Sequence, residues 1–183
     1  HVRSSGLLLK VGRSSPGEAG EVSDLVSRRG FLAGRGRDAV SIRPVGALPT
    51  SLFLETCTRC DSCISACPEG IIVRGSGGFP EIDFGRGACT FCDSCTEACD
   101  TGALVPDAEW PWRAVVEDSC LSASGVACRV CEDQCEATAI RFRLIPGGRS
   151  QPRIDIAGCT GCGACVAPCP ADAIRLDRRP VEE

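Results

Sequence analysis

Residues 57–69 read CTRCDSCISACPE and place four cysteines at the spacing C-x2-C-x2-C-x3-C. The same spacing returns in CTFCDSCTEAC at residues 89–99 and in CTGCGACVAPC at residues 159–169. A variant, C-x7-C-x2-C-x3-C, covers residues 120–135. All 16 cysteines of the chain therefore fall into four groups of four. The groups are Cys57, Cys60, Cys63 and Cys67; Cys89, Cys92, Cys95 and Cys99; Cys120, Cys128, Cys131 and Cys135; and Cys159, Cys162, Cys165 and Cys169.

This spacing is typical of a chain that curls around one compact inorganic object. Thiolates two residues apart can reach the separated corners of a cubane with four irons, and C-x2-C-x2-C-x3-C-P is the bacterial iron-sulfur signature. Pro68 and Pro170 complete that signature in two groups, whereas Asp100 and Glu136 replace the proline in the other two without removing a ligand. The sequence therefore predicts that all 16 cysteines bind four [4Fe-4S] clusters.

Two ways of sharing the cysteines among the clusters are open at this point. In bacterial two-cluster ferredoxins the fourth cysteine of a group binds the neighbouring cluster. A crossed arrangement of this kind adds Cys99 to the first group, Cys67 to the second, Cys169 to the third and Cys135 to the fourth. A nested arrangement, which pairs the first group with the fourth and the second with the third, is the alternative. Every cysteine is a ligand in both.

Disulfide bonds and zinc are the other uses to which a chain puts many cysteines. Eight disulfides fit the count of 16, but cysteines this closely spaced suit disulfides poorly. Zinc sites usually pair two C-x2-C knuckles that lie well apart, and here three or four cysteines follow one another within each group. The single histidine is His1, which excludes haem held by histidine, Rieske centres and zinc sites that contain histidine.

A longer repeat joins the groups in pairs. The connections PEGIIVRGSGGFPEIDFGRGA, residues 68–88, and EATAIRFRLIPGGRSQPRIDIAG, residues 136–158, each read as a strand, a Gly-Gly turn and a second strand. In the second connection Ile140, Phe142 and Leu144 alternate with arginines, which indicates a strand with one buried face. We expect an α+β fold of two tandem bacterial dicluster-ferredoxin modules, with short β-hairpins and short helices around the clusters.

Composition places the domain boundaries. Residues 1–49 are rich in Gly, Ser, Arg and Pro without a sustained period, so we expect a flexible basic arm. Two modules would follow at residues 50–108 and 109–183, each with two [4Fe-4S] clusters. We expect Trp110 and Trp112, at the seam, to pack the modules together.

Charge and hydropathy limit the classes of partner that the protein is expected to bind. Residues 1–50 carry eight basic and four acidic side chains, whereas residues 51–183 carry twelve and twenty. An acidic body does not suit nucleic acid, because phosphate binding needs clustered Lys and Arg. No apolar run approaches the roughly 18 residues that suggest a membrane span. We therefore expect no nucleic-acid partner and no membrane span.

The residues carry no sign of an enzyme. The lack of an internal histidine leaves no Ser/His/Asp or Cys/His constellation. Three functions fit the cysteines: an electron-transfer or assembly accessory protein, the electron-input iron-sulfur subunit of a larger oxidoreductase, and a zinc-stapled interaction module without redox activity. The iron-sulfur signature favours the first two.

The sequence resembles the NapF family, the ferredoxin-type accessory proteins of periplasmic nitrate reductase systems. The resemblance runs from SRRGFLAGR, residues 27–35, through CLSASGVACRVCEDQCEATAI, residues 120–140, to CTGCGACVAPCPADAI, residues 159–174. The C-x7-C opening of the third group is its most specific part. The resemblance implies a cytoplasmic four-cluster protein that associates with the catalytic molybdenum subunit of nitrate reductase before that subunit is exported.

Arg28 and Arg29 look like the core of a twin-arginine export signal. Such a signal continues into an apolar region of about 7 to 15 residues, but here Arg35, Arg37 and Asp38 follow. We therefore expect a cytoplasmic protein whose basic arm is flexible or docks a partner. Family members begin near this string, so Leu25 or Val26 is a candidate alternative start.

Overall fold

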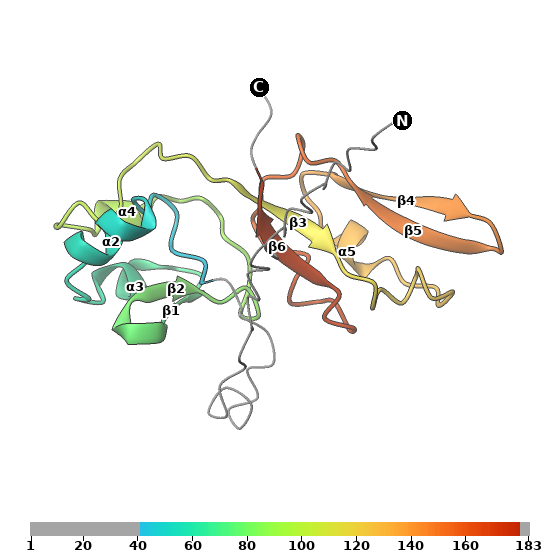
Figure 1. The fold of residues 1–183 in the computed structure, drawn as a ribbon, viewed down its shortest axis with the longest axis horizontal. Helices are drawn as coiled ribbons and strands as arrows, with labels where there is room; N and C mark the ends of the chain where they lie inside the picture. The colour runs from blue at the N-terminus through green and yellow to red at the C-terminus, as the bar shows by residue number, and fades with distance from the viewer. Residues whose placement is uncertain (1–40, 180–183) are drawn as a thin grey trace, which may run out of the picture. The chain divides into compact units, whose positions relative to one another are not determined.

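The computed structural model describes residues 41–179, which lie within one compact unit, Val40–Glu183 (Figure 1). Two halves repeat one plan, and we call residues 41–105 the first module and residues 106–179 the second module. The first module contains α2 (Thr50–Thr56), α3 (Ser62–Ala66), β1 (Ile72–Arg74), the 3-10 turn η1 (Ser76–Gly78), β2 (Pro80–Ile82) and α4 (Ser94–Glu97). The second contains β3 (Trp112–Val116), α5 (Val130–Asp133), β4 (Ile140–Ile145), β5 (Arg149–Ile154) and β6 (Ile174–Arg178).

Each module contains the predicted hairpin between its two cysteine groups. Strand β1 pairs antiparallel with β2, with Ile72 opposite Ile82, and β4 pairs antiparallel with β5, with Ile140 opposite Ile154. The glycine pairs occupy the turns, where Gly147 has φ 88°, a conformation that L side chains rarely adopt. The two hairpins are therefore confirmed.

The expected buried face of β4 is present only at its base. Ile140 is 1% exposed, Phe142 is half-buried, and Leu144 is 86% exposed. The hairpin of the second module has six residues in each strand, against three in the first. Its outer part extends past the elements that could cover it, so the alternation in the sequence continues where the core has ended.

A second pairing, which the sequence pattern does not predict, closes each module. Strand β3 pairs antiparallel with β6 over five residues, from Trp112 opposite Arg178 to Val116 opposite Ile174. In the first module an isolated bridge joins Ala47 to Leu104 in the same way. Both pairings bring together the segments before the first and after the last cysteine of a module, which are far apart in sequence.

The bridge corrects the expected boundary of the arm. Composition places residues 41–49 in the flexible arm, yet they pack on the first module. Ile82 N donates to Ile42 O at 2.7 Å, Val105 N donates to Gly46 O at 2.8 Å, and Leu48 N donates to Ala103 O at 3.1 Å. This segment supplies the backbone partners that β2 and residues 103–105 need. The remainder of the predicted arm lies outside the described residues.

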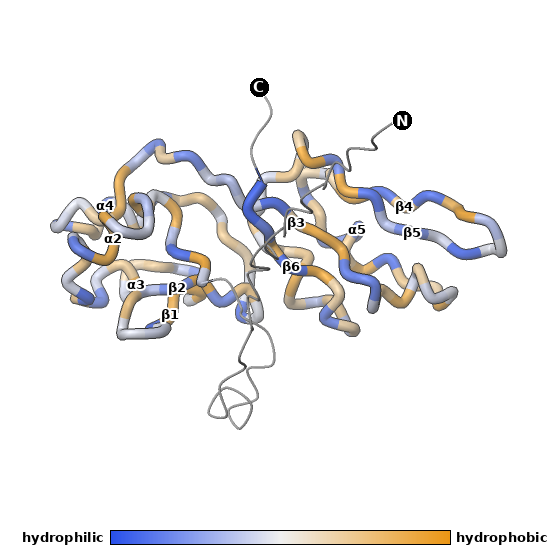
Figure 2. The backbone as a smooth tube through the Cα atoms, in the orientation of Figure 1, coloured by the Kyte–Doolittle hydropathy of each residue, from blue (hydrophilic) through white to orange (hydrophobic). Residues whose placement is uncertain are grey.

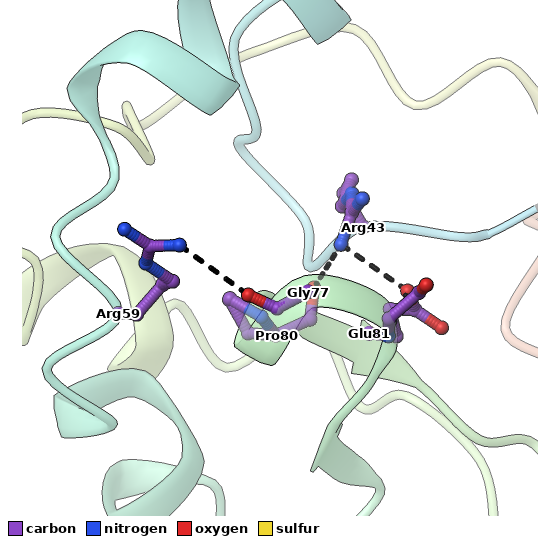
Figure 3. A network of polar contacts seen from close by, with 6 residues as sticks. Arg43, Arg59, Gly77, Pro80 and Glu81 are labelled. Atoms are coloured by element: carbon purple, nitrogen blue, oxygen red, sulfur yellow. Dashed lines mark hydrogen bonds and ion pairs between the residues drawn. The ribbon is translucent and has the colours of Figure 1, made fainter.

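Two arginines fix the first hairpin (Figure 3). Arg43 Nη1 donates to Pro80 O at 3.2 Å and to Glu81 Oε1 at 3.4 Å, and Arg59 Nη1 donates to Gly77 O at 3.4 Å. The Arg43 guanidinium also lies over the Phe53 ring, 5.3 Å from its centroid. The hairpin is thereby tied to the segment before α2 and to the loop of the first cysteine group.

The apolar core is thin and includes cysteines. Helices α3, α4 and α5 have only four or five residues, too few to be stable alone. Buried Phe53, Ile71 and Ile140 pack in one cluster with cysteines of all four groups. In Figure 2 most of β3 is hydrophobic, whereas much of β5 is hydrophilic. The modules thus lack the large apolar layer that usually holds two packed elements together.

Contacts between the modules confirm the packing role expected for Trp110. Its ring lies edge-on to Phe91 of the first module, with centroids 6.2 Å apart. Its Nε1 donates to Gly161 O of the second module at 3.2 Å. Beside it, Cys89 N donates to Cys162 O at 2.8 Å, so the second and fourth cysteine groups meet. Trp112 is a buried residue of β3, and its ring centroid lies 6.4 Å from that of Trp110.

Alanine substitutions at two glycines distinguish the cost of a strained backbone from the cost of steric crowding. Gly46 has φ 84°, and a Cβ there would lie 2.5 Å from Val105 O and from Thr96 Cγ2. Gly102 has φ 72°, and its Cβ would meet nothing within 4 Å. We expect Gly102→Ala to lower the free energy of unfolding by about 1–2 kcal/mol, because alanine disfavours the left-handed backbone conformation. Gly46→Ala should lower the free energy of unfolding by roughly 1–3 kcal/mol more than Gly102→Ala does. The added Cβ would collide with Val105 O, and the backbone there is held by the bridge between Ala47 and Leu104.

Thermal unfolding of the iron-loaded protein, followed by far-UV circular dichroism, checks this order. Equal shifts of the two unfolding midpoints would show that residues 41–49 do not pack on the first module.

Candidate functional site

Four hollows, each of about 330 to 390 Å³ and partly open to solvent, lie among the cysteine loops. Each is lined by four cysteines, and together they take in all 16 predicted site residues. Hollow A is lined by Cys57, Cys60, Cys63 and Cys99; hollow B by Cys67, Cys89, Cys92 and Cys95; hollow C by Cys120, Cys128, Cys131 and Cys169; and hollow D by Cys135, Cys159, Cys162 and Cys165.

The membership of the hollows follows the crossed arrangement. Cys99 leaves its own group to line hollow A, and Cys67 lines hollow B in exchange. Cys169 and Cys135 exchange in the same way in the second module. None of these four hollows combines the first group with the fourth or the second with the third, as the nested alternative requires. The chain segment that connects the two cysteine groups of a module therefore runs from one hollow of that module to the other.

Left-handed backbone turns curl the cysteine loops around the hollows. In the first group Arg59 and Asp61, on either side of Cys60, have φ 60° and 67°. The second group repeats this with Phe91 and Asp93, at φ 53° and 59°. The fourth group has glycines at both places, Gly161 and Gly163. Non-glycine residues adopt this conformation at a cost of about 1–2 kcal/mol each, so the loop geometry is maintained by what surrounds it.

The third group reaches its hollow by a longer loop. Its C-x7-C opening replaces the tight curl, and Ser122 within it is 1% exposed. Ser122 Oγ donates to Ser150 O at 2.9 Å, which attaches the loop to β5. Phe142 and Pro152 of the β4–β5 hairpin line hollow C directly. The C-x7-C loop, which is the most specific feature of the sequence, thus joins the third cysteine group to the β4–β5 hairpin.

Burial controls the protonation of the central thiols. Burial raises the pKa of Cys63, Cys95 and Cys131 to about 11, and that of Cys165 to about 12. Such thiols are protonated at pH 7 unless a cation replaces the proton. Binding of iron to these sulfurs must therefore release protons.

Two thiols at the surface behave in the opposite way. Cys60 and Cys92 are exposed, and the hydroxyls of Ser62 and Ser94 lower their pKa. A hydroxyl near a thiolate sulfur can donate a hydrogen bond to it and so favours the charged form. Each hollow of the first module therefore has a thiol that is more readily ionised than an ordinary cysteine.

Hydroxyl groups next to sulfur distinguish the first module from the second. Ser62 Oγ lies 3.3 Å from Cys60 Sγ, Ser94 Oγ lies 3.4 Å from Cys92 Sγ, and Thr101 Oγ1 lies 3.5 Å from Cys99 Sγ. In the second module the corresponding cysteines are Cys128, Cys162 and Cys169, and the residues two places after them are Val130, Ala164 and Ala171. At these three positions the sequence reads C-x-[ST] in the first module and C-x-[AV] in the second, a signal that the prediction of the site did not use.

The donor set fits a multi-iron cluster. Thiolate ligands select zinc, copper(I) and iron-sulfur clusters. Across residues 41–179, no three His, Cys, Asp or Glu side chains are grouped so that they could hold one metal ion. Four cysteines line each hollow, and their spacing along the chain is the iron-sulfur signature, which favours a polynuclear cluster over a single zinc. Over the same range no helix is long and apolar enough to cross a membrane.

Comparison with protein families agrees with this geometry. Residues 56–104 match one 4Fe-4S dicluster domain model, and residues 126–173 match a second. Each match covers the hairpin of one module with cysteines on both sides. Two tandem 4Fe-4S dicluster domains are therefore present, and the clusters that such domains bind are of the [4Fe-4S] type.

Relatives that match most of the chain identify the family. Ferredoxin-type protein NapF of Haemophilus influenzae is 46% identical over 140 residues, which cover 75% of this chain and 80% of that protein. The Escherichia coli K12 protein of the same name is 44% identical over 154 residues, with 82% and 94% covered. MauM of Paracoccus denitrificans, a methylamine utilization ferredoxin-type protein, is 34% identical, with 72% and 68% covered. Such relatives indicate an electron-transfer accessory protein and not an enzyme. The chain belongs to the NapF family of ferredoxin-type proteins.

Proposed function

We propose that the 16 cysteines bind four [4Fe-4S] clusters, one in each hollow, and that the protein is an iron-sulfur carrier with four redox centres. The observation that carries the proposal is the distribution of the cysteines, four to each hollow with one exchanged between neighbours. Cubane clusters of this kind supply one-electron storage. About sixteen irons per chain are expected from four cubanes.

The residues of the chain have separate roles toward the clusters. The cysteines hold the iron, and the exchanged residues Cys99 and Cys67 tie the two groups of the first module together. Apolar residues such as Ile71 and Ile140 cover the inner side of the hollows. The amides of Leu104, Ala139 and Ala173 donate to the Sγ of Cys99, Cys135 and Cys169 at 3.3 to 3.4 Å. Such bonds orient the sulfurs and tune the clusters.

Membership of the NapF family supports a role beside a larger enzyme. We propose that it acts in the cytoplasm and associates with the catalytic molybdenum subunit of periplasmic nitrate reductase before export, where it transfers electrons or assists maturation. Its relation to the NapF proteins supports this role. Co-purification of the tagged protein with a catalytic subunit that still has its export signal is the expected result.

A second role is favoured by one further relative. A component of an ion-translocating oxidoreductase complex from Methanosarcina acetivorans is 38% identical over 132 residues, which cover 66% of this chain and 46% of that protein. On this basis the alternative role is that of the electron-input iron-sulfur subunit of a larger complex. Isolation in a stable complex with membrane oxidoreductase subunits, without the nitrate reductase catalytic subunit, would decide for this role.

The crossed ligand sets predict which cysteines act together. Cys57→Ala and Cys99→Ala should each abolish the same cluster, because both residues line hollow A. Cys67→Ala and Cys89→Ala should abolish a different one, in hollow B. Iron content should fall from about sixteen to roughly twelve per chain, and electron paramagnetic resonance (EPR) of the reduced proteins identifies the missing signal. Loss of one common signal from Cys57→Ala and Cys67→Ala would contradict the crossed sets.

The hydroxyl contacts predict a shift of reduction potential. Hydrogen bonds to cluster sulfur stabilise the more negative, reduced state, so Ser62→Ala and Thr101→Val should lower the potential of the cluster in hollow A. The shift should be tens of millivolts, since about 1 kcal/mol corresponds to roughly 40 mV for one electron.

EPR-monitored potentiometry measures this shift, and the second module offers a matched control. Ala164→Ser adds a hydroxyl two places after Cys162 and should raise the potential of the cluster in hollow D. Unchanged potentials in all three variants would show that these hydroxyls do not reach the sulfurs.

A further inference from the structure

The β4–β5 hairpin differs from its counterpart in the first module in length and charge. Each of its strands has six residues, against three in β1 and β2. Residues 140–154 contain four arginines and no aspartate or glutamate. This is unusual in a body that carries twenty acidic against twelve basic side chains over residues 51–183.

The four arginines occupy matching positions in the register. Arg141 lies directly opposite Arg153, Arg143 opposite Gln151, and Ile145 opposite Arg149. Side chains at alternate positions of a strand point to the same face, so these residues share one face of the hairpin. All four arginines are exposed. We call Arg141, Arg143, Arg149 and Arg153 the arginine face.

The described part of the chain supplies little to neutralise this face. Glu132 Oε1 is 3.9 Å from Arg141 Nη1, but Glu132 bonds more closely to Arg129, at 2.5 Å. Arg149 Nη1 donates to the backbone oxygen of Ala123 at 3.4 Å. Within residues 41–179, Arg143 and Arg153 have no ion pair and no side-chain hydrogen bond.

In the first hairpin, by comparison, charged side chains form ion pairs with opposite charges. Arg74 pairs with Asp61, and Glu81 pairs with Arg43 (Figure 3). In the second hairpin, by contrast, two like charges stand directly opposite each other, an arrangement that destabilises a strand pair. Folding of the hairpin therefore gives no reason for these arginines, whereas a ligand with carboxylates does.

The tip of the hairpin carries an apolar side chain as well. Leu144, next to Arg143, is 86% exposed, more than Leu52, Leu54 or Val126. Because side chains alternate along a strand, Leu144 is on the face opposite the arginines. On the arginine face itself, arginine binds carboxylates through two parallel hydrogen bonds. A phosphate backbone or a lipid headgroup would also meet the acidic remainder of the body.

We infer that the arginine face is the docking surface for an acidic face of a partner protein. The inference rests on the proposed function for the identity of that partner, the nitrate reductase catalytic subunit, and it specifies where the partner binds. Phe142 and Pro152 of the same hairpin line hollow C. Phe142 and Pro152 are on the face opposite the arginines, so the hairpin itself lies between a partner docked here and hollow C.

The test compares two charge-matched double variants of the full, iron-loaded chain. Arg143→Glu/Arg153→Glu reverses two charges of the arginine face. Arg178→Glu/Arg179→Glu reverses two exposed charges at the end of β6, in the same module. The first variant should fold, because a glutamate at 153 would face Arg141 as an opposite charge. Iron content and circular dichroism verify this for both.

The probes are the purified catalytic subunit with its export signal and a synthetic glutamate-rich peptide. We expect the first variant to bind both at least tenfold more weakly than wild type at low ionic strength. The second variant should bind within about twofold of wild type. Binding of wild type should weaken as salt is added, because exposed charges are screened.

The other outcomes separate the two proposals. If both variants bind the catalytic subunit as wild type does, the docking surface is wrong and the proposed function stands. If wild type binds only the peptide, in an arginine-dependent way, the surface stands and the proposed partner is wrong. Binding to neither probe overturns both. Tighter binding to duplex DNA or to anionic phosphatidylserine vesicles than to the peptide, at equal ionic strength, overturns the surface.

Discussion

Four cysteine thiols line each hollow, and the described part of the chain, residues 41–179, is arranged around these four hollows. The buried apolar residues pack in one cluster with cysteines of all four groups. The helices that carry Cys63 and Cys131 are single turns, and the loops beside them take left-handed backbone turns at Arg59 and Asp61. None of these features is favourable alone. Bonds from thiolate to iron would offset them, as in small metal-dependent domains.

The exchange of the fourth cysteine makes each module a cooperative unit. Because Cys67 lines hollow B and Cys99 lines hollow A, neither hollow can form without the hairpin that lies between the two groups. The same holds for Cys135 and Cys169. The modules then meet at the second and fourth groups, through the bond from Cys89 N to Cys162 O and through Trp110. Hollows B and D are therefore neighbours, while A and C lie at the two outer positions.

The sequence predicts the parts of this structure that depend on local spacing. Cysteine periodicity identifies the site residues, and the Gly-Gly turns identify both hairpins. It does not predict the pairing of β3 with β6, or the packing of residues 41–49, because those partners are about 60 residues apart and lack an alternating pattern. It places Leu144 on a buried face, since alternation records strand geometry and not where the core ends. The hydroxyls beside Cys60, Cys92 and Cys99 are visible in the sequence only once the neighbouring sulfur is known to be a ligand.

The central claim is that inorganic clusters, and not buried hydrocarbon, make this polypeptide compact. Removal of iron and sulfide by a chelator under mild oxidation, followed by limited proteolysis and circular dichroism, tests it most directly. The account predicts that the stripped chain loses its ordered signal and is cleaved throughout residues 50–179 at rates close to those of an unfolded chain. A stripped monomer that keeps its circular dichroism and resists the protease would contradict it.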